Sequence, residues 1–168
     1  MNKLILALVL LCCCSLLYGG QESSRSNNAF IEISGTKLHL GMTMAEVKEK
    51  LAGDTSEVKE NLWIVGSNIP GPIVQFTKGR LNFANRIWTT PDNDFPVALW
   101  GAVNTLNEQG FDSCKVTAGS KVTPDSESHN IWIDCGEKSV LLTRQSMSGK
   151  IIYTRVYEQL GKMHDTPD

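Results

Sequence analysis

The hydrophobic pattern is most regular in residues 40–53, which read LGMTMAEVKEKLAG. Apolar side chains recur there at helical spacing on one face: Met44, Val47 and Leu51. Thr43 and Glu46 stand three positions apart, the spacing of a capping box that satisfies two amide donors at a helix start. Gly53 follows where a left-handed residue commonly ends a helix. The segment predicts a helix of about two turns, which must pack on another element because it is too short to be stable alone.

A second helix is expected from Phe95 to Gln109. Asp94 can cap its start, and Gly110 followed by Phe111 is typical of a helix that ends at a glycine. The apolar face of this helix is predicted to consist of Leu99, Trp100, Val103 and Leu106.

Short apolar runs around the two helices predict strands. They fall at residues 30–33, 38–40, 62–65, 73–76, 81–88, 114–117, 130–135, 140–144 and 151–157. Lys78-Gly79 and Ser148-Gly149 mark tight turns between neighbouring runs. Helices separated by hairpin-connected strands predict an α+β fold, with short helices packed on antiparallel sheet. The polar segment 89–94 divides the chain into residues 30–92 and 93–163, and the similar layout of these halves suggests an internal duplication.

The first twenty residues have the pattern of a secretory signal peptide. Lys3 precedes an apolar run from Leu4 to Tyr18, and Gly19-Gly20 closes it. The run is shorter than the about 20 residues that a membrane-spanning helix needs, although a retained anchor is the alternative. Residues 21–29 are polar and are expected to form a flexible tether, and residues 164–168 a disordered tail. The protein is therefore expected to be exported, to the periplasm or beyond.

Three adjacent cysteines in this leader allow a lipid anchor. Bacterial lipoproteins are cut before a cysteine that then carries lipid, and Leu11 stands three residues ahead of Cys14, the candidate acceptor. The residue before Cys14 is another cysteine instead of Gly, Ala or Ser, and the apolar run continues beyond it. The alternative is that the cysteines act as small apolar residues of the signal peptide. If the signal peptide is cleaved, we expect the protein to reach a membrane only through such a lipid anchor.

Composition narrows the class of protein. The chain has 168 residues, 41% of them hydrophobic, and a net charge of −2. This balance excludes a protein built around nucleic acid, which needs a basic surface. Removing residues 1–20 takes away Lys3 and leaves a net charge of −3 and two cysteines, Cys114 and Cys135. In an exported protein an even pair predicts one disulfide bond.

Residues able to do chemistry are scattered. His39, His129 and His164 have no spacing that links them to a nucleophile, and the sequence contains no common catalytic or phosphate-binding motif. Asp125, Glu127 and His129 alternate in a segment expected to be a loop. We therefore predict a protein that is not an enzyme and that needs no cofactor or metal. The alternative is a small metal-dependent hydrolase that uses the 125–129 segment.

Aromatic and arginine side chains alternate on two of the expected strands. They are Arg86, Trp88, Tyr153, Arg155 and Tyr157. Trp, Tyr and Arg dominate the energetics of protein interfaces, which makes these five residues a candidate interaction surface. Aromatic cross-strand pairs packed beneath a helix would explain the same pattern.

The helix 40–53 and the hairpin that follows also resemble a known family. The segment Leu40 to Val47, with Leu51 and Gly53, and the hairpin residues Phe76, Gly79 and Leu81 are similar to the outer-membrane assembly lipoprotein (SmpA/OmlA-like) family, whose relatives include β-lactamase inhibitor proteins. The resemblance covers residues 36–88, and Asp54-Thr55 replaces the proline usual in that family. It implies a non-catalytic module of the bacterial cell envelope whose partner is another envelope or secreted protein. An inhibitor that fills the cleft of a partner enzyme is the alternative function.

Overall fold

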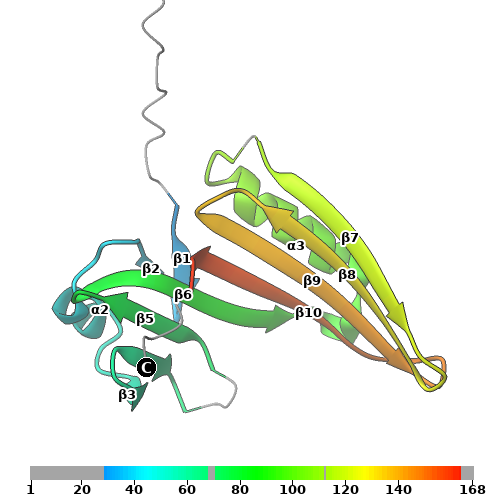
Figure 1. Cartoon of the computed structure of the whole chain (residues 1–168), viewed down its shortest axis with the longest axis horizontal. Helices are drawn as coiled ribbons and strands as arrows, with labels where there is room; N and C mark the ends of the chain where they lie inside the picture. The colour runs from blue at the N-terminus through cyan, green and yellow to red at the C-terminus, as the bar shows by residue number, and fades with distance from the viewer. Residues whose placement is uncertain (1–28, 68–70, 112, 164–168) are drawn as a thin grey trace, which may run out of the picture.

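The computed structural model describes residues 29–67, 71–111 and 113–163. Its elements, labelled as in Figure 1, are β1 (Ile31–Ile33), β2 (Thr36–Leu38), α2 (Met44–Lys50), β3 (Thr55–Lys59), β4 (Leu62–Val65), β5 (Ile73–Thr77), β6 (Arg80–Thr89), the 3-10 turn η1 (Pro91–Asn93), α3 (Phe95–Asn107), β7 (Lys115–Val122), β8 (Ser126–Asp134), β9 (Lys138–Met147) and β10 (Lys150–Gly161). The predicted signal peptide, Cys14, the residues of the predicted tether up to 28 and the tail 164–168 lie outside the described residues. No helix in the described part of the chain combines the length and the apolar character needed to cross a membrane.

Eight strands form one antiparallel sheet in the order β3-β4-β5-β6-β10-β9-β8-β7, and β1 and β2 form a separate hairpin. Four consecutive strands from each half of the chain form the large sheet, β3–β6 and β7–β10. In each half a helix precedes these strands, α2 before β3–β6 and α3 before β7–β10. The halves meet where β6 pairs with β10, and η1 lies in the predicted boundary segment 89–94. The predicted α+β fold with antiparallel sheet is confirmed, and the structure is rich in sheet.

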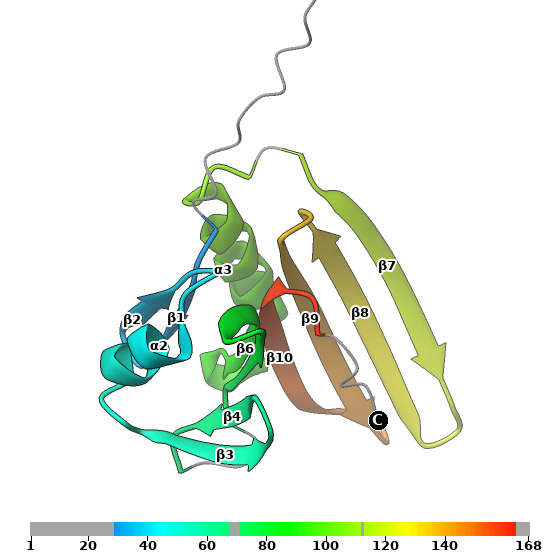
Figure 2. The same ribbon diagram turned by 60° about the vertical axis from the view of Figure 1, so that its left-hand side comes forward.

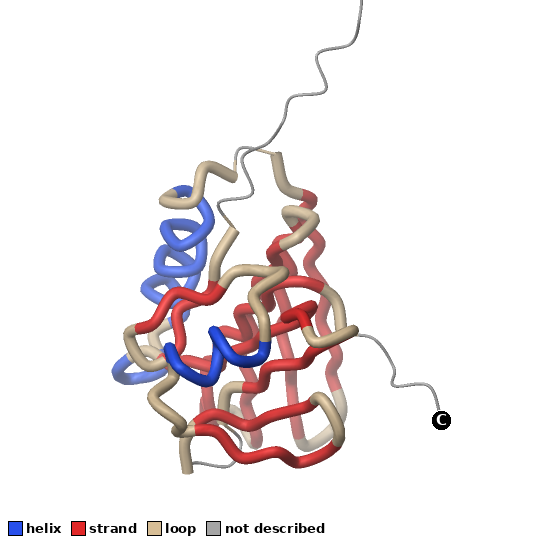
Figure 3. Tube along the Cα trace, turned by 90° about the vertical axis from the view of Figure 1, so that its left-hand side faces the viewer, coloured by secondary structure: helices blue, strands red, loops and turns tan. Residues whose placement is uncertain are grey.

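Both helices lie against the same face of this sheet, which we call the inner face. Val47 and Leu51 of α2 join a core with the β1–β2 hairpin and with Leu160 of β10. Helix α3 packs on a second core that includes Val156 of β10, and Figure 3 shows α3 against one side of the strands. Val156 and Leu160 are four residues apart on one strand and therefore point to the same side. The opposite side of the sheet is called the outer face below.

The first turns of both helices are capped as the sequence predicts. The Thr43 side chain accepts a hydrogen bond from the amide of Glu46 (3.2 Å), and a Glu46 carboxylate oxygen accepts one from the amide of Thr43 (2.7 Å). The Thr43 hydroxyl also donates a hydrogen bond to this carboxylate oxygen (2.8 Å), and the bonds donated by the Thr43 amide and hydroxyl lower the pKa of the Glu46 carboxyl. Asp94 caps α3 by accepting a hydrogen bond from the amide of Val97 (3.0 Å). The capping box and the α3 cap are therefore confirmed.

The cap of α2 can be tested by removing one oxygen atom. We expect Thr43→Ala to lower the free energy of unfolding by about 1 kcal/mol, because the amide of Glu46 loses its acceptor. Thr43→Ser keeps that oxygen and serves as the matched control, with a stability close to that of the wild type. Urea unfolding of the three proteins gives the comparison, and equal stability of the alanine and serine variants would contradict a role for the cap.

The predicted apolar face of α3 is wrong in part. The buried residues of the helix are Ala98, Ala102 and Leu106, with Leu99 partly buried, whereas Trp100 is 68% exposed and Val103 is also exposed. The cause is a tryptophan of β6: a Cβ atom added to Gly101 would lie 2.9 Å from Cη2 of Trp88. Because Trp88 occupies this space, the helix turns its small side chains toward the sheet and its large ones toward solvent.

The structure contains one strand that the sequence did not predict and a hairpin that is longer than predicted. Residues 55–59 form β3, an edge strand in which all residues but the first are exposed. Residues 115–122 and 126–134 form a long hairpin, so Glu127 and His129 lie on β8 and only Asp125 remains in the turn. Sequence alternation predicted only the first residues of β7, because all residues of this strand are exposed and neither face is buried.

Candidate interaction surfaces

The outer face is lined with apolar and aromatic side chains in the half of the sheet built from β7–β10. In Figure 1 the helix α3 lies behind β8 and β9, so this view looks onto the outer face of that half. The strand pairing places one row of side chains across it: Thr117, Trp132, Leu141, Tyr157 and Ile87. Trp132 is 46% exposed and its three following neighbours in the row are half-buried, whereas Val140, Leu142 and Val156 of the inner face are buried. No helix among the described residues covers this row.

Arginine and tyrosine lie beside this row on β10. The Arg155 guanidinium lies 4.1 Å from the centre of the Tyr153 ring, a cation–π contact that holds both side chains together on the outer face. The registers place Lys115, Lys121 and Asp134 on the same face as Arg155. This part of the outer face therefore carries more positive than negative charge, although the whole chain is acidic.

The five predicted surface residues are divided between the two faces. Tyr153, Arg155 and Tyr157 lie on the outer face, whereas Arg86 and Trp88 lie on the inner face beneath β1 and α3. The Arg86 guanidinium donates a hydrogen bond to the backbone oxygen of Glu32 (2.7 Å) in β1. Trp88 packs in the α3 core. The sequence predicted that both strands carry aromatic and arginine side chains, but it did not predict which face of the sheet each group occupies.

Three charged side chains meet on the inner face at the junction of the two halves. Glu158 is 1% exposed and lies between two cations, with Oε2 at 2.6 Å from Nε of Arg86 and Oε1 at 2.5 Å from Nζ of Lys138. Glu158 Oε1 receives no hydrogen bond of good geometry among the described residues, but the Lys138 ammonium balances its charge. The ammonium also donates a hydrogen bond to the backbone oxygen of Phe30, the residue before β1.

The pKa of the lysine in this ionic cluster is perturbed, but the Lys138 side chain has no access to solvent. Burial lowers the pKa of Lys138, Glu158 opposes that effect, and the Arg86 guanidinium lowers the pKa further. A lysine with a lowered pKa is often a catalytic group. Here the Lys138 side chain is fully buried, and its ammonium is hydrogen-bonded to the backbone of Phe30 and ion-paired with Glu158. The Lys138 ammonium therefore has a structural role, because its contacts link the segment at the start of the β1–β2 hairpin to the large sheet.

The predicted disulfide is confirmed. Cys114 and Cys135 are bonded, with Cα atoms 4.3 Å apart, at the point where the β7–β8 hairpin opens. The bond closes the end of the hairpin opposite its turn, and Figure 2 shows β7 as the free edge of the sheet. This edge strand is therefore held both by its pairing with β8 and by a covalent link.

In the alternating segment that could have bound a metal, His129 and Glu127 contact each other. Nε2 of His129 lies 2.8 Å from a carboxylate oxygen of Glu127, and Asp125 stands in the adjoining turn. Across the described ranges no group of three or more His, Cys, Asp or Glu side chains could hold a metal ion. Of the other histidines, Nδ1 of His39 lies 3.2 Å from the backbone oxygen of Ala29, and His164 is outside the described residues.

Sequence reasoning missed Trp132 and the ionic cluster. Trp132 belongs to an expected strand, and its alternation with Ile131 and Ile133 could have placed it on the opposite face. Glu158 alternates with Val156 and Leu160, so a carboxylate on an apolar strand face was the signal for a buried ion pair.

Comparisons of the chain with protein-family models, with curated proteins and with solved structures found no match.

Proposed function

We propose that this chain is an exported, non-catalytic module that binds another envelope or secreted protein through its outer face. The observation that carries the proposal is the row of apolar and aromatic side chains across β8, β9 and β10, centred on Trp132 and Tyr157 and left uncovered by the helices. Tryptophan, tyrosine and arginine are the residues that contribute most to protein interfaces when a partner covers them.

The charges of the outer face indicate the chemistry of the partner. Arg155, Lys115 and Lys121 surround the aromatic row and are opposed there by Asp134 alone among charged residues of the β7–β10 registers. An acidic patch on the partner, with an apolar centre, would complement this arrangement. Such complementarity increases the rate of association and selects against basic surfaces.

The arrangement of the halves agrees with the proposed class of protein. A helix followed by four antiparallel strands occurs twice, and the two units meet at β6 and β10. We propose that this repetition reflects an internal duplication, the layout implied by the resemblance of residues 36–88 to the outer-membrane assembly lipoproteins and their inhibitor relatives. The leader-like residues 1–20 and the Cys114–Cys135 disulfide support export to an oxidising compartment.

The experiment compares two exposed tryptophans on opposite sides of the molecule. The exported chain is incubated with an envelope extract as wild type, as Trp132→Ala and as Trp100→Ala, and any retained protein is purified and titrated against all three. We expect the Trp132→Ala variant to bind at least about tenfold more weakly, since interface tryptophans commonly contribute more than 1.4 kcal/mol. Trp100 lies on α3, so its variant should bind like the wild type.

Either of two results would contradict the proposal. One is the absence of any partner that binds the wild type stoichiometrically, and the other is an equal loss of affinity in both tryptophan variants. If the partner is an enzyme whose activity falls on binding, the module is an inhibitor, and the outer face keeps its proposed role.

A further inference from the structure

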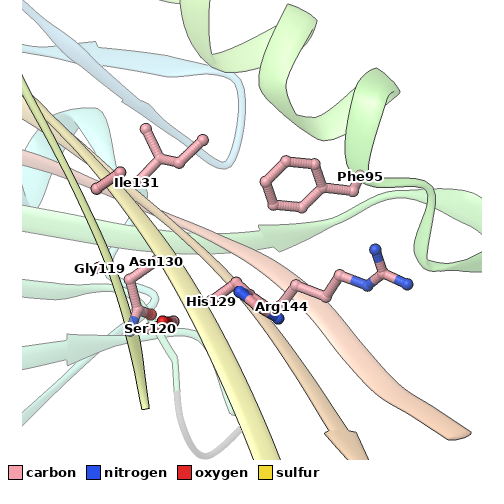
Figure 4. Close-up of a pocket in the computed structure, with 8 residues that line it drawn as sticks. Phe95, Gly119, Ser120, His129, Asn130, Ile131 and Arg144 are labelled. Carbon is pink, nitrogen blue, oxygen red and sulfur yellow. The ribbon is translucent and has the colours of Figure 1, made fainter. Parts of the chain in front are cut away.

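A groove separates the start of α3 from strands β7, β8 and β9 on the inner face. Its volume is about 540 Å³, within the range of sites that hold small molecules. Its lining includes Phe95 of α3 and, from the three strands, Ala118, Ser120, His129, Ile131 and Arg144. Figure 4 shows the Phe95 ring facing the strands across the groove, with His129 and Arg144 on neighbouring strands. The outer face lies on the other side of these strands, so the groove is distinct from it.

The lining residues form an apolar row and a polar row. The register pairs Ala118 with Ile131, and Figure 4 shows Phe95 facing Ile131 from the helix. Two residues further along β7, on the same face, Ser120 pairs with His129, and His129 pairs with Arg144. The groove thus has an apolar wall on one side and hydrogen-bond donors on the other. Sites for small molecules commonly combine apolar walls with a few polar groups in this way.

Among the described residues, the Arg144 guanidinium in the groove has neither an ion-pair partner nor a hydrogen-bond partner. Arg144 is half-buried. The acidic side chain that shares its face on β8, Glu127, is paired with His129. Arg86, in contrast, is paired with Glu158, and Arg155 lies over Tyr153. A guanidinium presents a rigid pair of donors that fits a carboxylate, and here it stands beside apolar surface.

We propose that this groove binds a small amphipathic carboxylate. Its carboxylate accepts hydrogen bonds from Arg144, with Ser120 within the same polar row, and its apolar body lies against Phe95, Ala118 and Ile131. The site is independent of the protein-binding outer face proposed above, because it uses the opposite face of the same strands.

The test uses octanoate as the probe and two arginine variants of the exported chain. Octanoate is titrated into the ¹⁵N-labelled protein, and amide shifts are followed for the wild type, Arg144→Gln and Arg155→Gln. We expect saturable shifts at Ala118 and Ile131, a dissociation constant raised at least about tenfold in Arg144→Gln, and an unchanged constant in Arg155→Gln. Octanamide, which has the same chain without the charge, should bind the wild type as weakly as octanoate binds Arg144→Gln.

The two variants separate this proposal from the proposed function. Arg155→Gln should weaken binding of the protein partner and leave octanoate binding intact, and Arg144→Gln should do the reverse. The dispersion of the amide spectrum checks that each variant is folded. The absence of saturable octanoate binding, equal constants for the wild type and Arg144→Gln, or equal weakening by both variants would overturn the carboxylate site.

Discussion

Replacing Glu158 by glutamine should destabilise the protein by about 3–5 kcal/mol, the cost of removing one partner from a buried ionic group. The Glu158 carboxylate lies within 2.6 Å of Arg86 and 2.5 Å of Lys138, and it is the single negative charge of the three. A neutral amide would leave two cations beside each other in the interior. Lys138 could lose its proton instead, but deprotonating an amine at neutral pH also costs free energy. Urea unfolding monitored by circular dichroism measures the difference.

A second substitution distinguishes charge from shape at this position. In the double variant Glu158→Gln/Lys138→Met the cluster keeps only Arg86, whose side chain is 29% exposed and can still bond to the backbone of Glu32. We therefore expect the double variant to be more stable than Glu158→Gln alone. If the methionine gives no recovery, or if Glu158→Gln unfolds within about 1 kcal/mol of the wild type, the cluster is not held by the balance of charge that we describe.

The sequence predicted those parts of the fold that depend on residues close together in the chain or on the simple count of a residue type. Thr43 and Glu46 specify the start of α2 because the capping box needs only residues three positions apart. The cysteine pair was predictable because only two cysteines follow the predicted signal peptide. The face of α3 was not predictable, because the large residues Trp100 and Val103 outweigh alanines in any hydrophobic pattern.

The candidate sites depend on contacts between distant segments, which the sequence pattern does not contain. Arg144 enters the groove because β9 lies between β8 and β10, and the arrangement of the strands decides which face is covered. Tyr157 and Trp88 have similar sequence environments, yet the register pairs Trp88 with Val156 and places it under α3. Assigning residues to the inner or outer face therefore required the order of strands in the sheet.

Gly161, the last residue of β10, lies at a close approach between backbones. It has a φ of +76°, and a Cβ atom added there would stand 2.0 Å from the backbone oxygen of Asn82 and 2.9 Å from a methyl group of Leu40. The first of these neighbours is backbone of β6, held by the pairing of Gly161 with Phe83. The amide of Gly161 also donates a hydrogen bond to the backbone oxygen of Glu137 (2.7 Å), so this residue cannot move away without losing that bond.

Gly161→Ala should therefore lower the free energy of unfolding by about 2–5 kcal/mol, the sum of a left-handed alanine and an overpacked contact. Gly149 provides a matched control, because it has the same φ of +76° and no atom within 4 Å of an added Cβ. Gly149→Ala should cost only the conformational part, about 1–2 kcal/mol. Thermal and urea unfolding of both variants separates the two contributions. If the variants lose equal stability, β6 and β10 can separate at this end of the sheet without cost, and the close contact at Gly161 does not constrain the junction of the two halves.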